Sequence, residues 1–157
     1  MKADFLNHVI KTNDDGRKIF NFRDVFISDI HWGTHASRAK ALCRALTNIQ
    51  TQNLTLVGDI ADFWHMSQKD TWGMGPYHRQ GIAHILRMRA NKIYIPGNHE
   101  DTLRTRTKTF PQHGDRDMVY RNLIGGSLFG IEVVRDSIYT DPNGKRYFVC
   151  HGDEFDP

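Results

Sequence analysis

Carboxylate, imidazole and carboxamide side chains follow four short apolar runs of this sequence. In chain order these side chains are Asp29 and His31, then Asp59, then Asn98 and His99, and finally His151 and Asp153. The set contains no thiolate, so it suits a borderline-to-hard ion such as Mn²⁺, Fe²⁺ or Zn²⁺ better than a structural zinc. The residue types therefore predict a catalytic kind of metal site.

Each of these groups also has an ordinary explanation when it is taken alone. An Asp-x-His sequence can cap a turn, Gly-Asp is common in loops, and Gly-Asn-His can form a tight turn. Four such groups in order, each at the end of an apolar run, are much harder to explain in that way. In open α/β sheets, ligands bind outside the carboxyl ends of the strands. We therefore expect the four groups to converge in one crevice.

The elements that must position these side chains alternate between strand and helix. Strands are predicted at Val25–Ile27, Leu54–Val57 and Lys92–Ile95. The helical spacing of Ala39, Leu42, Cys43, Leu46 and Ile49, with Ser37 as N-cap, predicts the first helix, and 77–90 is the second. Such alternation is typical of βαβ units on a mostly parallel sheet, so the expected fold class is α/β.

Beyond residue 130 the pattern predicts strands at 131–134, 137–140 and 146–150. The Asn143-Gly144 pair between the last two strands is a hairpin signal. We expect the strand 146–150 to deliver His151 to the same crevice as the other groups. Residues 1–23 are predicted to form a loosely ordered N-terminal segment, and residues 24–157 a single domain.

A pair of metal ions gives these residues distinct roles. Asp29, His31 and Asp59 are assigned to one ion, and Asn98 and His151 to the other, which Asp59 can bridge with its two oxygens. Two such ions bind a hydroxide between them and hold the oxygens of a phosphate during in-line attack. His99 is predicted to stabilise or protonate the leaving oxygen.

The same residues resemble the calcineurin-like metallophosphoesterases. Asp29-x-His31, Gly58-Asp59, Gly97-Asn98-His99-Glu100 and His151-Gly152 match the first four motifs of that superfamily in order. Within it, the stretches 58–64, 94–100 and 151–156 are most similar to the UDP-2,3-diacylglucosamine pyrophosphatase group. The resemblance implies two divalent ions, with Mn²⁺ favoured, and a substrate that is a nucleotide-linked lipid diphosphate of lipid A biosynthesis. It also implies a metallophosphoesterase-type sandwich.

The sequence departs from the resemblance at two places. The pyrophosphatases often carry Arg at the position of His99, whereas the wider superfamily carries His. The superfamily's later Gly-His-x-His motif is not found after His151, which predicts a domain lacking the C-terminal part of the sheet and its helices. Two alternatives therefore stay open: an inactive remnant that acts as a binding module, and a phosphodiesterase with another substrate.

The sequence signal for residues that contact the substrate is weaker than the signal for the metal ligands. Trp64 could belong to an apolar lid for acyl chains, and Arg104 and Arg106 could contact phosphates or anionic headgroups. The alternative for Trp64 is ordinary packing beneath a loop. The alternative for Arg104 and Arg106 is a basic loop exposed to solvent.

Composition fits an ordinary globular domain. The chain has 157 residues, a net charge of +3, 39% hydrophobic and 25% charged residues, values that argue against a disordered or disulfide-scaffold protein. No apolar run approaches the length of a membrane span, and the scattered basic residues do not suggest nucleic-acid binding. Cys43 and Cys150 are expected to be small buried residues. We expect a cytoplasmic enzyme whose substrate is a phosphorylated small molecule or a nucleotide-linked lipid. With a lipid substrate, the enzyme is expected to contact the inner membrane peripherally.

Overall fold

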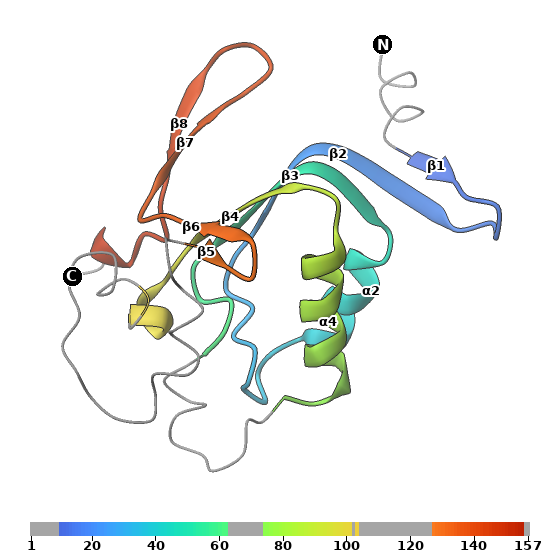
Figure 1. The fold of residues 1–157 in the computed structure, drawn as a ribbon, viewed down its shortest axis with the longest axis horizontal. Helices are drawn as coiled ribbons and strands as arrows, with labels where there is room; N and C mark the ends of the chain where they lie inside the picture. The colour runs from blue at the N-terminus through green and yellow to red at the C-terminus, as the bar shows by residue number, and fades with distance from the viewer. Residues whose placement is uncertain (1–9, 63–73, 102, 104–126, 156–157) are drawn as a thin grey trace.

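A six-stranded mixed sheet forms the centre of the molecule (Figure 1). The computed structural model describes residues 10–62, 74–101, 103 and 127–155. The sheet order is β1-β2-β3-β4-β6-β5, in which β2, β3, β4 and β6 are parallel and the edge strands β1 and β5 are antiparallel. The strands are β1 (Ile10–Thr12), β2 (Lys18–Ile27), β3 (Ile49–Val57), β4 (Asn91–Ile95), β5 (Ser127–Leu128) and β6 (Ile131–Val133). The expected α/β class is confirmed.

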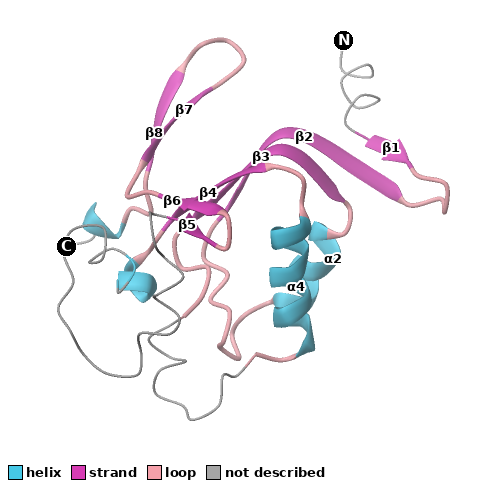
Figure 2. Cartoon of the chain, in the orientation of Figure 1, coloured by secondary structure: helices cyan, strands magenta, loops and turns pink. Residues whose placement is uncertain are grey.

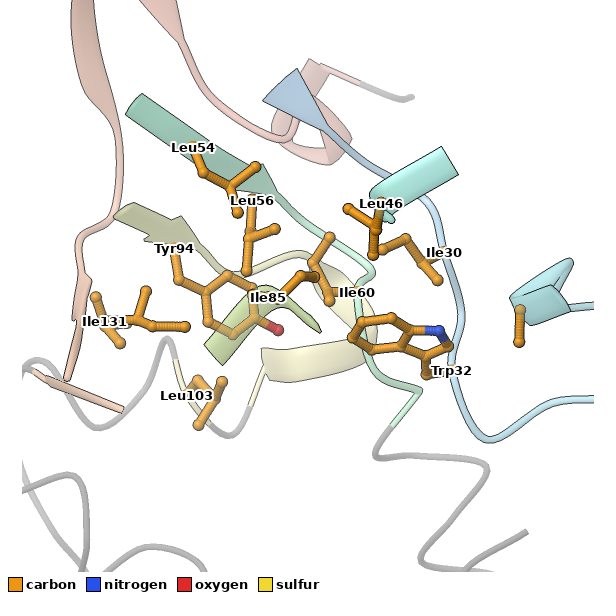
Figure 3. Close-up of a cluster of buried hydrophobic side chains, with 12 residues drawn as sticks. Ile30, Trp32, Leu46, Leu54, Leu56, Ile60, Ile85, Tyr94, Leu103 and Ile131 are labelled. Carbon is orange, nitrogen blue, oxygen red and sulfur yellow. The ribbon is translucent and has the colours of Figure 1, made fainter. Parts of the chain in front are cut away.

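Two helices, α2 (Ala39–Leu46) and α4 (Pro76–Arg87), pack side by side against one face of this sheet. The strand register places Ile27 opposite Leu56 and Leu56 opposite Tyr94, so these side chains form a row beneath the helices. Figure 3 shows the resulting core, in which Ile85 of α4 meets the sheet residues. This core fixes the strand ends from which the predicted ligands project.

A separate antiparallel hairpin, β7 (Ser137–Thr140) and β8 (Arg146–Val149), reaches the opposite face of the sheet (Figure 2). The Tyr139 ring packs edge-on against Phe26, with ring centroids 5.1 Å apart, and the Arg23 guanidinium donates to the carbonyl of Thr140 at 2.9 Å. The hairpin predicted from Asn143-Gly144 is confirmed, with Gly144 at a φ of 84°.

The hairpin stands apart from the main sheet. Among the described residues, strand β8 pairs with β7 alone and does not join the parallel sheet, where β6 is the neighbour of β4. The tight turn at Asn143-Gly144 brings β7 and β8 together, so that the backbone groups on their facing edges pair with each other. His151 therefore does not follow a strand of the parallel sheet, although it still reaches the other ligands.

The boundaries of several elements also differ from those expected. Strand β3 begins at Ile49, a residue that the helical spacing had placed in the first helix. Arg38 rather than Ser37 stands at the N-cap of α2, and no side chain caps that helix. Strand β1 and the start of β2 fall within segment 1–23, which was expected to be loosely ordered. This part of the chain belongs to the main sheet, because Phe20 pairs with Ile49.

Two short 3₁₀-helices, η1 (Asn98–Glu100) and η2 (Asp153–Phe155), follow β4 and β8. Cys43 is buried, Cys150 is partly buried, and both are free thiols. Among the described residues, no helix has the length and apolar character needed to cross a membrane.

Truncation of Leu54 tests the core described above. Leu54 is 1% exposed on β3, so Leu54→Ala should lower the free energy of unfolding by about 2–5 kcal/mol. Leu86→Ala is the matched control, because Leu86 is 39% exposed on α4 and its truncation should cost far less. Equal losses in urea denaturation would contradict the described packing.

Candidate metal centre

The chain segments that follow β2 and β3 continue to run side by side beyond the strands. The backbone N–H of Asp29 donates to the carbonyl of Gly58 at 3.1 Å, and that of His31 donates to the carbonyl of Asp59 at 2.8 Å. A parallel bridge between Trp32 and Ala61 ends this backbone pairing between the two segments. The loops that carry predicted ligands are therefore held by backbone hydrogen bonds.

Three of the predicted ligands have left-handed backbone conformations. The φ angles are 54° at Asp29, 50° at His31 and 52° at Asp59. Such a conformation costs an L-residue about 1–2 kcal/mol, although Asp and His tolerate it better than most. Non-glycine residues in sparsely populated conformations cluster at functional sites, so this geometry is a second sign of function besides residue type.

Asp29, Asp59 and His151 form one group of ligand atoms. One atom from each residue lies within 4.8 Å of the others. His151 Nε2 is 3.5 Å from Oδ1 of Asp59 and 3.2 Å from Oδ1 of Asn98. The structure thus brings together four of the five residues that were assigned to metal.

The fifth, His31, belongs to a second group with Asp62 and His99, again within 4.8 Å. Oδ2 of Asp62 lies 3.7 Å from Nδ1 of His31 and 3.0 Å from Nδ1 of His99. Oδ2 of Asp59 lies on the Nε2 side, 3.5 Å from His31 and 3.9 Å from His99. The two rings meet edge to face, with centroids 4.7 Å apart.

Asp62 is a site residue that the sequence reasoning did not assign. Oδ2 of Asp62 lies on the Nδ1 side of both rings, and each Nε2 lies on the side of Asp59. The available signal was its position three residues after Asp59, in the segment that continues beside the loop after β2, where the N–H of Asp62 donates to the carbonyl of Trp32 at 2.9 Å.

The pKa of His99 reflects these neighbours. Burial acts to lower the pKa, but the contact with Asp62 and the negative charges of Asp59 and Glu100 outweigh it. The pKa of His99 therefore lies above its ordinary value.

Glu100, also unassigned from the sequence, connects the loop after β3 to the loop after β4. Its Oε2 accepts from the backbone N–H of Asp59 at 2.8 Å and of Gly97 at 2.7 Å, and its Oε1 accepts from that of Ala61 at 2.7 Å. The side chain is fully buried. Burial raises the pKa of Glu100 even though these backbone donors favour the charged form.

The two loops approach so closely that glycine is required at two positions. A Cβ on Gly97 would overlap the Asp59 carboxylate and come within 2.9 Å of His151 Nε2. A Cβ on Gly58, which has a φ of 66°, would overlap the His151 ring. These glycines allow His151 and Asp59 to come within contact distance of each other.

The donor set fits a pair of divalent ions. Carboxylate, imidazole and carboxamide atoms gather in two adjacent groups, and no cysteine is among them. The weaker substrate candidates, Trp64, Arg104 and Arg106, lie outside the described residues.

Comparison with known proteins gives one match. A family model described as calcineurin-like phosphoesterase matches residues 22–156. Neither a curated protein nor a solved structure matches the chain.

Replacement of Glu100 by Gln tests whether its carboxylate organises the site. Gln has one acceptor oxygen where Glu100 uses two, so at least one buried backbone N–H would face an amide NH₂ group. Glu100→Gln should therefore lower the free energy of unfolding by about 2 kcal/mol or more. Glu132→Gln, an exposed position on β6, is the control, and urea titration that finds the two variants equal would contradict this role.

Proposed function

The chain belongs to the calcineurin-like phosphoesterase family, and on that premise we propose that it hydrolyses a phosphodiester or diphosphate bond with two divalent metal ions. Membership of this family supports the activity of a metal-dependent phosphoesterase. The number of ions, the substrate and the residue roles given below are our proposal.

The position of Asp59 is the observation that carries this proposal. Its Oδ1 lies beside His151, in the first group of ligand atoms, and its Oδ2 lies beside His31, in the second. A buried carboxylate between two groups of donors is suited to bridge two ions, which is the arrangement used in two-metal phosphate chemistry.

In the proposed assignment Asp29, His31 and Asp59 hold one ion, and Asp59, Asn98 and His151 hold the other. This assignment joins Asp29 of the first group to His31 of the second, so it does not follow the two groups as they stand in the structure. His31 offers Nε2 for this purpose because its Nδ1 side faces Asp62. When bound, the ions would supply an activated hydroxide and neutralise phosphate charge. We propose Mn²⁺ as the metal, with Fe²⁺ or Zn²⁺ as the alternatives that the same donors accept.

His99 is proposed to deliver a proton to the leaving oxygen. In its protonated imidazolium form, His99 turns Nδ1–H toward the Asp62 carboxylate, 3.0 Å away, and the proton transferred is the one on Nε2, on the side of Asp59. Asp62 acts as a positioning residue, because it orients the ring without touching the substrate.

For the substrate we propose UDP-2,3-diacylglucosamine, cleaved to a lipid phosphate and UMP. The support is the resemblance of stretches 58–64, 94–100 and 151–156 to that pyrophosphatase group. A lipid substrate would place the enzyme in the cytoplasm with peripheral contact at the inner membrane.

The first experiment measures hydrolysis of bis(p-nitrophenyl) phosphate by the purified chain with Mn²⁺. We expect turnover that EDTA abolishes and Mn²⁺ restores. His99→Ala should lower kcat by roughly 10²-fold or more, because it removes the proton donor. His35→Ala, at an exposed position outside the two ligand groups, should leave kcat unchanged.

Metal-independent turnover, or equal rates for the two variants, would contradict the proposed mechanism. Absence of turnover with folded protein would favour the alternative of an inactive binding module. A kcat/KM for UDP-2,3-diacylglucosamine no higher than that for the aryl diester would reject the lipid substrate and favour a phosphodiesterase with another substrate.

A further inference from the structure

A cavity of about 410 Å³ lies between the beginnings of helices α2 and α4. Its lining comes from residues 37–41, 44 and 75–78, and it includes none of the proposed metal ligands. The volume is within the range of small-molecule sites. The cavity is therefore a candidate site distinct from the metal centre.

The charged side chains that line this cavity, among the residues that the structure describes, are all basic. Arg38, Lys40 and Arg44 line it, and neither helix carries an acidic residue in its first turn. Within the described part of the chain, none of the three forms an ion pair with a carboxylate, and Lys40 instead lies over the Tyr77 ring at 5.5 Å. Among the described residues, nothing compensates the positive charge of this cavity.

Backbone donors add to this charge. Both helices begin at the cavity, where the first N–H groups of a helix lack partners within the helix and carry partial positive charge. No side chain caps α2, and Arg38, at its N-cap position, is a cation rather than an acceptor. An anion in the cavity would meet both the amides of α2 and the guanidinium groups.

Two buried polar atoms of lining residues have no hydrogen-bond partner among the described residues: Ser37 Oγ and His78 Nε2. His78 Nδ1 accepts from the N–H of Gly75 at 3.0 Å, which places the ring proton of the neutral imidazole on Nε2. Both atoms can therefore donate, and buried donors without acceptors are uncommon in folded proteins.

We propose that this cavity binds an organic phosphate, with the phosphate at Arg38, Arg44 and the start of α2. Pro76 and the half-exposed Tyr77 ring form the remaining wall and suit an apolar or aromatic substituent. Phosphate is the anion that best uses helix amides and guanidinium groups together. This site goes beyond the proposed function, since it does not require that the metal centre be active.

NMR titration of the full chain, with Mg²⁺ present, tests the site. The probes are inorganic phosphate and phenylphosphonate, whose carbon–phosphorus bond a phosphoesterase does not cleave. We expect shifts of the amides of Ala39, Lys40, Tyr77 and His78, and tighter binding of phenylphosphonate than of methylphosphonate. Shifts at Asn98 and His99 report separately on the metal centre, so failure at one site is distinguishable from failure at the other.

The double variant Arg38→Gln/Arg44→Gln should weaken phenylphosphonate binding at this cavity by roughly tenfold or more. Arg87→Gln, at the other end of α4, is the control and should bind like the wild type. Absence of shifts at α2 and α4 in the wild type, or unchanged affinity in the double variant, would overturn the proposal.

Co-sedimentation identifies the source of the phosphate. Binding to phosphatidylcholine vesicles that contain phosphatidic acid, lost in the double variant, would support a lipid headgroup as the ligand. Phenylphosphonate binding at the cavity without vesicle binding would support a soluble organic phosphate.

Discussion

The candidate metal centre depends on one buried carboxylate. Glu100 accepts hydrogen bonds from the backbone of Asp59, Ala61 and Gly97, and so fastens the loop after β3 to the loop after β4. Hydrogen bonds to a charged acceptor contribute more than neutral ones, and the cost of leaving their donors unpaired is higher still. Asp59 can stay at the meeting point of two ligand groups because its own backbone is held in this way.

These hydrogen bonds matter because three of the candidate ligands have strained backbone conformations. Left-handed conformations at Asp29, His31 and Asp59 each cost about 1–2 kcal/mol, and the ladder between the two loops offsets part of this cost. The benefit is that the donor atoms converge before any metal binds. A site organised in advance does not spend binding free energy on ordering its ligands.

Sequence reasoning located the candidate ligands because each follows an apolar run, and strand ends of a parallel sheet meet at one edge. Asp62 and Glu100 were not assigned, because their roles depend on loop conformations that strand periodicity does not determine. His151 follows the hairpin that Asn143-Gly144 predicted, and that hairpin is a sheet of its own rather than part of the parallel sheet. The predicted N-cap, Ser37, lies one residue before the actual N-cap, Arg38, and Ile49 pairs in β3 because sheet hydrogen bonding outweighs helical spacing.

The central claim is that Asp59 lies between two metal ions. Electron paramagnetic resonance of the Mn²⁺-loaded chain tests it most directly, because two ions that share a bridging ligand are magnetically coupled. We predict two Mn²⁺ per chain with an exchange-coupled signal, which Asp59→Asn should abolish, while Asp136→Asn, away from both ligand groups, should leave it intact. A single uncoupled Mn²⁺ per chain, or coupling that survives Asp59→Asn, would contradict the account.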